Sequence, residues 1–287
     1  MSVAQGFVEQ PRTPSPDAGG WTLLRPYNPR LRQWAGLRVW VVGGSTGIGR
    51  ATALALAARG AQVLVSARGA AALDALVAEH RQAAREQSTQ HPLQAWPLDV
   101  TDAAAVRTCA TEILAQGPLD LVLYCAGHYR AQRATAFDLA EMQRHMAINY
   151  SGALNLLDAL LPAMIARRAG KILVMGSASA LRGIKRASTY SAARGAQLAY
   201  VQAVGVEVAG HNVQINAIAQ NFVDNPTYFP ADVQANPRFQ ERLKREVPLG
   251  RLVGAREDAE FAAYLCSEAA NCFVGQVFPL CGGWIQR

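Results

Sequence analysis

Short apolar runs alternate with longer alanine-rich stretches along the chain from Leu37 to the C-terminus. The short runs are predicted strands, at residues 38–42, 62–66, 94–98, 119–124, 171–175, 212–217 and 275–280. The longer stretches are predicted helices, at residues 47–58, 70–86, 103–115, 139–167, 189–208 and 255–266. Alternation of this kind is typical of a parallel sheet covered on both faces. The predicted fold class is therefore α/β, a doubly wound parallel sheet of the Rossmann type with about seven strands in a single domain.

Residues 1–36 differ from the rest because Pro, Gly and polar residues interrupt every apolar run. They are predicted to form a partly ordered N-terminal extension, and residues 37–287 the Rossmann-type domain. The extension's apolar side chains able to dock on that domain are Trp21, Leu23, Leu24 and Trp34. Because the first 20 residues lack the apolar core of a signal peptide, a cytoplasmic location is expected.

The composition limits the classes of partner. Hydrophobic residues make up 51% of the chain and charged residues 17%, which suits a folded domain with a buried core. Lys and Arg number 28 against 21 Asp and Glu, so the formal net charge is +7. The bases are scattered in short groups without interleaved aromatic residues, so no nucleic-acid partner is expected. No apolar stretch is long enough to span a bilayer, so no membrane partner is expected either.

The cysteines give no sign of a disulfide framework or a metal site. Their number is odd, they form no C-x-x-C pair, and no His is spaced to complete a zinc site. They are predicted to be reduced, mostly packed thiols: Cys109, Cys125, Cys266, Cys272 and Cys281.

A glycine-rich turn, Val41-Val42-Gly43-Gly44-Ser45-Thr46-Gly47-Ile48-Gly49, follows the first predicted strand and opens the first predicted helix. Glycines let the backbone approach a pyrophosphate closely, while the helix N-terminus presents free amides and the positive end of its dipole. Strand, spacing and helix agree here, so the turn predicts a dinucleotide site. The residues expected to bind the cofactor in this turn are Gly43, Ser45, Thr46, Gly47, Ile48 and Gly49.

The end of the second strand bears on the choice of cofactor. An acidic residue there would bind the ribose 2′-hydroxyl of NAD, but the run is Val65-Ser66-Ala67-Arg68. Arg68 is suited to a 2′-phosphate as a charge-assisted fork, so NADP is favoured over NAD. The alternative for Arg68 is a solvated surface arginine.

With these features, the chain from about residue 37 onwards resembles the short-chain dehydrogenase/reductase family. Asp99 and the neighbouring Val100 resemble the family residues at the adenine ring, and Ala126-Gly127 match half of the motif Asn-Asn-Ala-Gly. Val223, in the loop after the sixth predicted strand, is a further cofactor-binding position by the resemblance. Asn149 resembles the family's structural and proton-relay asparagine on the long central helix.

Ser177 closes the fifth predicted strand and Tyr190 follows thirteen residues later, which is the family's spacing for its catalytic serine and tyrosine. One helical turn further, where the family has Lys, this chain has Arg194. A tyrosine that exchanges a proton near neutral pH needs a fixed cation beside its oxygen, and arginine supplies one, although it cannot itself relay a proton. The predicted catalytic group is Ser177, Tyr190, Arg194 and Asn149.

The resemblance implies an NADP-dependent oxidoreductase, a carbonyl reductase or alcohol dehydrogenase in which hydride passes between the nicotinamide and a carbonyl or alcohol. Tyr190 would be the general acid/base. The spacing Ser-x12-Tyr-x3-Arg and residues 219–230 also resemble the halohydrin dehalogenases, which bind halide instead of a dinucleotide. Those enzymes carry an aromatic residue in the glycine turn, where this chain has Gly47. A cofactor-independent lyase of that type, and a non-catalytic dinucleotide-binding protein, remain alternatives.

The substrate pocket is expected to be bounded by His128, Tyr129, Tyr150, Ala178, Leu181 and a mobile segment, residues 222–247. The aromatic residues of that segment predict a small, apolar carbonyl or alcohol substrate. His128 is expected to line the pocket or be hydrogen-bonded rather than to act as a ligand. By family likeness the protein is predicted to be a homotetramer, in which Leu198, Val201 and Val204 form an apolar stripe.

Overall fold

Alternate residues of each strand pack on opposite sides of one parallel sheet. The computed structural model describes residues 34–86 and 93–286. Val39 and Val41 pack in one buried cluster, while Trp40 and Val42 pack in the other, as the period of two in a strand requires. The strands are β1 (Arg38–Val42), β2 (Gln62–Ser66), β3 (Leu93–Ala95), β4 (Leu121–Tyr124), β5 (Gly170–Ser177), β6 (Val213–Gln220) and β7 (Val277–Leu280).

The sheet has the order β3-β2-β1-β4-β5-β6-β7, and all of its pairs are parallel. The predicted fold class and strand number are therefore confirmed. β3 is shorter than the predicted 94–98 because Pro97 has no amide hydrogen to extend the ladder. The chain still follows β2 beyond it, since the Trp96 and Leu98 amides donate to the Val65 and Ala67 carbonyls at 2.9 and 3.0 Å.

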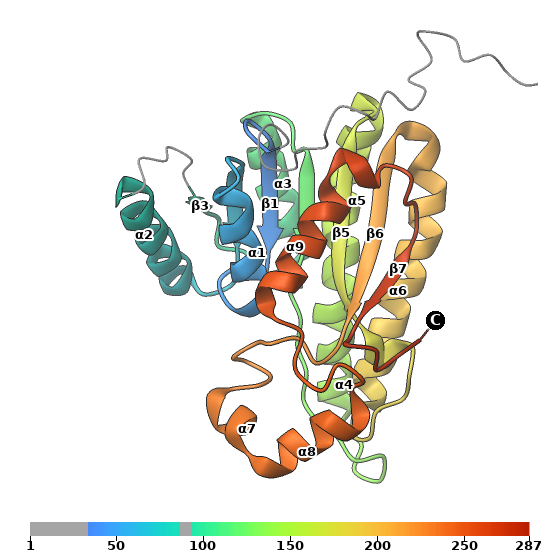
Figure 1. Ribbon diagram of the computed structural model, residues 1–287. Coiled ribbons are helices and arrows are strands. Elements are labelled where there is room, and N and C mark those ends of the chain that lie inside the picture. Colours follow the sequence, from blue (N-terminus) through green and yellow to red (C-terminus); the bar gives the residue numbers. More distant parts are fainter. Residues whose placement is uncertain (1–33, 87–92, 287) are drawn as a thin grey trace, which may run out of the picture. The chain divides into compact units, whose positions relative to one another are not determined.

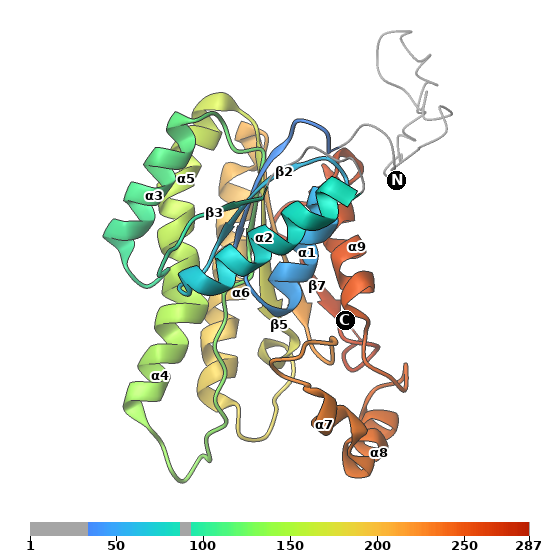
Figure 2. The ribbon, with the colours of Figure 1, turned by 90° about the vertical axis from the view of Figure 1, so that its left-hand side faces the viewer.

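Helices cover both faces of the sheet, as Figures 1 and 2 show. One face carries α3, α5 and α6, and the other carries α1, α2 and α9. The bounds of these helices are α1 (Gly47–Ala57), α2 (Ala70–Glu86), α3 (Ala103–Ala115), α5 (Gly152–Arg167), α6 (Ser188–Val208) and α9 (Ala255–Cys266). All of them were predicted, and their ends differ from the prediction by one residue at most, except where α5 begins.

The helix predicted over residues 139–167 is one continuous run with a wide turn inside it. α4 (Leu139–Met146) leads into a π-helical turn, Ala147–Ser151, which leads into α5. A π-helical turn inside an α-helix is often found at functional sites. Here it contains Asn149.

The segment 222–247 is not the mobile loop that the sequence predicted. It contains α7 (Ala231–Ala235) and α8 (Pro237–Glu246). The signals for α8 are present in the sequence, since Asn236 caps it by accepting from the Arg238 amide at 2.9 Å and Pro237 occupies its first turn. The orange helices α7 and α8 lie together beyond the carboxyl ends of the strands in Figure 1.

The prediction that an apolar stripe on α6 is free for subunit contacts is also wrong. Leu198 and Val201 are 3% and 1% exposed and pack in the core of this chain, where Leu198 lies against Gly176 of β5. Val204 is partly buried against the same cluster. Leu198 and Val201 are therefore unavailable to a second subunit, and the homotetramer stays a prediction from family likeness.

Residues 1–33 of the predicted extension lie outside the described residues. Trp34 does pack on the domain: it is 4% exposed and belongs to the apolar cluster on the face of α1 and α9. Among the residues that the structure describes, no helix has the length and apolarity that crossing a bilayer requires.

Candidate active site

A cleft of about 1370 Å³ follows the carboxyl ends of the strands. It lies where the sheet order changes direction, between β1 and β4, which is where open α/β sheets bind ligands. Every residue predicted to bind the cofactor lines this cleft, and so do Ser177, Tyr190 and Arg194. Its volume exceeds that of a typical pocket for one small ligand, so it has room for a dinucleotide and a substrate together.

The glycine turn at one end of the cleft fits a pyrophosphate. Gly43 has a φ of +85°, and a Cβ there would lie 2.4 Å from the Ala126 nitrogen, so only glycine allows the loops after β1 and β4 to approach. α1 begins without a side-chain cap at Thr46 and without an acidic residue in its first turn. By contrast, Asp102 caps α3. The N-terminus of α1 therefore keeps its amides and its positive dipole end for an anion.

Arg68 and Asp99 lie at the same end of the cleft. Asp99 accepts hydrogen bonds from the amide and the hydroxyl of Thr101 at 2.9 and 2.7 Å. Burial raises the pKa of the Asp99 carboxyl, but the bonds from Thr101 and the charge of Arg68 outweigh burial and hold it below its ordinary value. Arg68 has no ion pair with another described residue, so its guanidinium is available to a phosphate.

Tyr190 and Arg194 lie one helical turn apart on α6, with their side chains in contact. Arg194 Nε donates to the Tyr190 hydroxyl at 3.2 Å, and its Nη1 donates to the Met175 carbonyl at 2.8 Å and to Gln197 Oε1 at 2.9 Å. Arg194 is only 5% exposed. Burial alone would lower its pKa, but Tyr190 and neighbouring tyrosines raise it overall, so this cation is permanent. The arrangement places a fixed positive charge beside the Tyr190 oxygen.

Ser177 ends β5 and is 6% exposed. Its hydroxyl oxygen accepts from the Ser179 amide at 3.2 Å and lies 2.9 Å from the Ser179 hydroxyl. These contacts fix the orientation of the Ser177 side chain at the wall of the cleft.

Asn149 is the one predicted catalytic residue that does not line the cleft. Its side chain lies behind Gly127, where it accepts from the His128 amide at 2.9 Å and donates to the His128 carbonyl at 2.8 Å. A Cβ on Gly127 would lie 2.3 Å from Arg194 Nη2 and 3.4 Å from Asn149 Oδ1. Asn149 therefore holds the chain segment after β4, and Gly127 makes room for Arg194.

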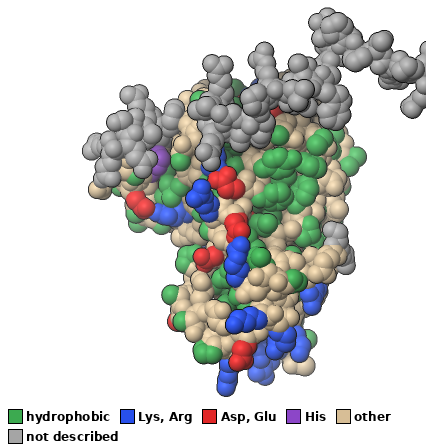
Figure 3. All heavy atoms as spheres, viewed as in Figure 1, with side chains coloured by type: hydrophobic (Ala, Val, Ile, Leu, Met, Phe, Trp, Pro, Cys, Tyr) green, Lys and Arg blue, Asp and Glu red, His purple; other side chains and the backbone are tan. Residues whose placement is uncertain are grey.

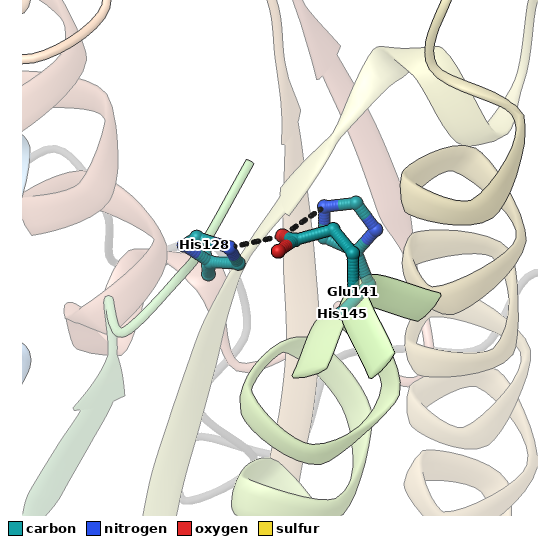
Figure 4. Close-up of side chains that lie close together, drawn as sticks. All are labelled: His128, Glu141 and His145. Atoms are coloured by element: carbon teal, nitrogen blue, oxygen red, sulfur yellow. Dashed lines mark hydrogen bonds and ion pairs between the residues drawn. The ribbon is translucent and has the colours of Figure 1, made fainter. Parts of the chain in front are cut away.

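A buried polar cluster that the sequence did not predict supports this segment from α4 (Figure 4). Glu141, only 3% exposed, lies 2.5 Å from His128 Nε2 and 3.5 Å from His145 Nε2. Arg130 lies 3.6 Å from the same carboxylate. Burial raises the pKa of Glu141, but the hydrogen bond with His128 and the positive charges around it outweigh burial and hold the pKa below its ordinary value. The spacing of Glu141 and His145 by four residues on a helix was the available signal.

The three side chains in Figure 4 converge as metal ligands can, but their hydrogen bonds favour a structural role. His145 Nε2 already accepts from the Arg130 amide at 3.1 Å, so its lone pair is occupied, and its Nδ1 lies 2.9 Å from the Thr189 hydroxyl. Burial lowers the pKa of His145 and favours the neutral ring. The cluster therefore fastens residues 128–130 to α4 through its own hydrogen bonds.

The fastened segment carries Tyr129, whose ring lies edge-on to the Tyr190 ring at 5.0 Å. Tyr129 and Tyr228 line the cleft, as predicted for Tyr129 and for the segment 222–247. Three other pocket predictions were wrong, because Tyr150 packs against Tyr200, Ala178 is fully buried in the core and Leu181 packs against the core. His128 does not line this cleft but is hydrogen-bonded to Glu141, which is one of the two roles expected for it.

Gln220, at the end of β6, links the sheet to α9. Its Nε2 donates at 2.5 Å to Asp258 Oδ1 on α9. Asp258 is 0% exposed, and its second oxygen has no hydrogen-bond partner among the described residues. Burial raises the pKa of Asp258 to about 6, despite the bond from Gln220.

All five cysteines are free thiols, with Cys109, Cys266 and Cys281 buried and Cys272 exposed, as predicted. Burial raises the pKa of Cys109 to about 11 and that of Cys266 to about 12. These thiols are therefore protonated and unreactive at neutral pH.

Comparison with known proteins matches residues 42–285 to a family profile described as enoyl-(acyl carrier protein) reductase. The chain is 31% identical over 270 residues to 2-keto-3-deoxy-L-fuconate dehydrogenase of Xanthomonas campestris pv. campestris, which covers 92% of this chain and 85% of that protein. It is 32% identical over 246 residues to the L-tagatose-forming galactitol 2-dehydrogenase of Cereibacter sphaeroides, which covers 85% of this chain and 93% of that protein.

Among solved structures, a gluconate 5-dehydrogenase from Burkholderia cenocepacia J2315 in complex with NADP and tartrate superposes with a TM-score of 0.81. The two are 25% identical, and the match covers 89% of this chain and 98% of that one.

Proposed function

Since the chain belongs to the short-chain dehydrogenase/reductase family and its relatives are oxidoreductases, we propose that it transfers hydride between NADP and a carbonyl or alcohol, with Tyr190 as general acid/base. The proposal depends on one observation: the uncapped N-terminus of α1 and the Tyr190–Arg194 pair line the same cleft.

Each residue of the catalytic group has a separate role in this reaction. In the direction of reduction, the Tyr190 hydroxyl donates its proton to the carbonyl oxygen, while Ser177 donates a hydrogen bond to the same oxygen. The resulting phenolate is stabilised by Arg194, whose Nε lies 3.2 Å from the tyrosine oxygen. A bound nicotinamide supplies the hydride. Asn149 acts through the backbone of His128 rather than on the reacting atoms, and Arg194 holds charge without relaying protons.

The preference for NADP is supported by Arg68 at the end of β2 and by the lack of any carboxylate in residues 65–68. The B. cenocepacia structure, which contains NADP, is consistent with this choice. A 2′-phosphate would accept a charge-assisted fork from Arg68, which the 2′-hydroxyl of NAD would not use as well.

The test is a fluorescence titration with NADPH and with NADH. NADPH should bind more tightly, and Arg68→Ala should weaken it about tenfold to a hundredfold, because a hydrogen bond to a charged group contributes about 1.5–3 kcal/mol. NADH affinity should change little. Arg107→Ala, which removes another exposed arginine, on α3 outside the cleft, is the matched control. Failure of both nucleotides to bind would remove the proposal and favour the cofactor-independent lyase.

A further inference from the structure

The substrate end of the cleft is lined by basic side chains from two separate segments. The connection between β5 and α6 contributes Arg182, Lys185 and Arg186, and α8 contributes Arg242 and Arg245. Glu246 is the acidic residue among the lining side chains of these two segments. Figure 3 shows Lys and Arg side chains gathered at the lower end of the view, where Figure 1 places α8.

Three of these cations have partners within the chain. Arg182 donates to the Trp284 carbonyl at 2.5 Å, and its guanidinium lies 4.6 Å from the centre of the Trp284 ring. Arg242 and Arg245 share Glu246 at 3.1 and 3.2 Å. One carboxylate thus balances two arginines, so the α8 side of the cleft keeps a net positive charge.

Lys185 and Arg186 have no ion pair among residues 34–86 and 93–286. The same is true of the terminal nitrogens of Arg242, because only its Nε contacts Glu246. The Arg242 guanidinium is placed by the Phe222 ring, which lies 5.6 Å from it. The two terminal nitrogens of Arg242 therefore remain available to bind an anion in the cleft.

Arg186 and Arg242 line the cleft together with Tyr129 and Tyr190. Burial raises the pKa of Tyr129, and the positive charges of Arg242 and Arg186 partly oppose this, so both guanidiniums lie within electrostatic reach of its hydroxyl. The Tyr129 ring lies 5.0 Å from the Tyr190 ring. Arg186 also has a left-handed backbone, with a φ of +63°, and is held there by the Gln132 amide, which donates to its carbonyl at 2.9 Å.

A left-handed conformation is unfavourable for a residue with a side chain, and such residues concentrate at functional sites. Two arginines that line one cleft, with Glu246 as the single carboxylate among the lining residues of their two segments, can bind a planar anion, because each guanidinium can hold a carboxylate by two parallel hydrogen bonds. The aromatic side chains Phe222, Phe229 and Trp284 beside them offer an apolar wall for the rest of the molecule.

We propose that the substrate of this site is an acid: a carbonyl or hydroxyl compound whose carboxylate is held by Arg186 and Arg242 while its oxygen faces Tyr190. This assignment rests on the proposed oxidoreductase function and replaces the apolar substrate expected from the aromatic residues alone. Arg186 and Arg242 are thus the residues that determine specificity, one from each of the two segments.

The test is calorimetric titration of the NADP⁺-saturated protein with a panel of 2-oxo acids, including benzoylformate, each paired with its methyl ester. Oxidised cofactor and a ketone cannot react, so the readout is binding. The acids should bind about tenfold or more tightly than their esters, because the ester lacks the charge. Arg186→Gln and Arg242→Gln should each weaken acid binding by about tenfold and leave ester binding unchanged.

Arg238→Gln is the matched control, since Arg238 is an exposed arginine of α8 that does not line the cleft. It should leave acid binding unchanged. Equal affinity for acids and esters across the panel, or an equal loss in Arg238→Gln, would overturn the acid site even if NADP⁺ binds. If NADP⁺ does not bind but the free protein still prefers acids, and both cleft variants abolish that preference, the acid site stands and the proposed hydride transfer fails.

Discussion

The carboxyl of Asp258 should make the stability of this protein fall as the pH rises from about 4 to 6. Asp258 is fully buried and has one hydrogen-bond donor, Gln220, at 2.5 Å. Burial raises its pKa from 3.8 to about 6, so between these values the folded state binds a proton that the unfolded state has lost. The free energy of unfolding therefore decreases with pH in that window and levels off above it.

The magnitude follows from the two pKa values. The difference between a pKa of 3.8 and one of about 6 lowers the free energy of unfolding by about 3 kcal/mol between strongly acidic and neutral pH. About 2 kcal/mol of this decrease falls between pH 4.5 and 7.5. Asp258→Asn removes the ionisation and leaves an oxygen that can accept from Gln220. Relative to the wild type, the variant should therefore become more stable by about 2 kcal/mol on going from pH 4.5 to 7.5.

The assay is urea unfolding of both proteins at pH 4.5, 6 and 7.5, followed by circular dichroism. Glu260→Gln serves as the control, because Glu260 lies on the same helix α9 but its side chain is 52% exposed. The control should show a much smaller change in relative stability. A constant difference between the wild type and Asp258→Asn across this pH range would refute the reasoning that Asp258 is a buried, under-partnered carboxylate.

Three further predictions concern the cleft and its support. Arg194→Lys should keep substantial reductase activity because the charge remains, whereas Arg194→Met should move the pH at which alcohol oxidation is half-maximal upward by about one unit or more; an unchanged pH–rate profile would contradict the role of the charge. Gly47→Phe should abolish NADPH binding in a titration, because the ring enters the phosphate turn, and should cost about 1–2 kcal/mol of stability in urea unfolding, since Gly47 has a φ of +54°; retained binding would show that the cofactor lies elsewhere. Glu141→Gln should lower stability by about 1–3 kcal/mol through loss of the buried partner of His128. It should raise KM more than it lowers kcat, because the segment that carries Tyr129 loosens while Arg194 still holds the Tyr190 hydroxyl; Glu112→Gln, on exposed α3 surface, is its control.

Local sequence signals predicted the sheet and the cofactor end of the cleft. The β1 strand, the glycine turn and α1 are contiguous, so spacing alone places Gly43 and Gly47 at the strand end and the helix N-terminus. Ser177 and Tyr190 are likewise placed by the strand and helix that carry them. The residue types and their spacing were sufficient because each element's geometry is fixed locally.

The residues that were misplaced depend on contacts between distant segments. Tyr150 lies in the π-helical turn, which rotates its side chain toward Tyr200 instead of the cleft. The periodicity of an α-helix does not predict this rotation. Gln220 and Asp258 are 38 residues apart, so their bond was invisible in the sequence. Helix α8 was missed although its signals were present, since Phe239 and Leu243, four residues apart, pack against the core and Asn236 and Pro237 mark its start. Most of its other residues are charged, so the segment resembled a solvated loop.

Hydride transfer with Tyr190 as general acid/base is tested most directly by NADPH oxidation, measured by absorbance. The wild type and Tyr190→Phe are compared with a panel of 2-oxo acids and neutral ketones. The wild type should turn over at least one carbonyl compound. Tyr190→Phe should lose about a hundredfold or more of this activity without a change in NADPH affinity, because only the proton donor is removed. Turnover that survives the substitution undiminished, or NADPH binding without turnover of any carbonyl by the wild type, would contradict this mechanism.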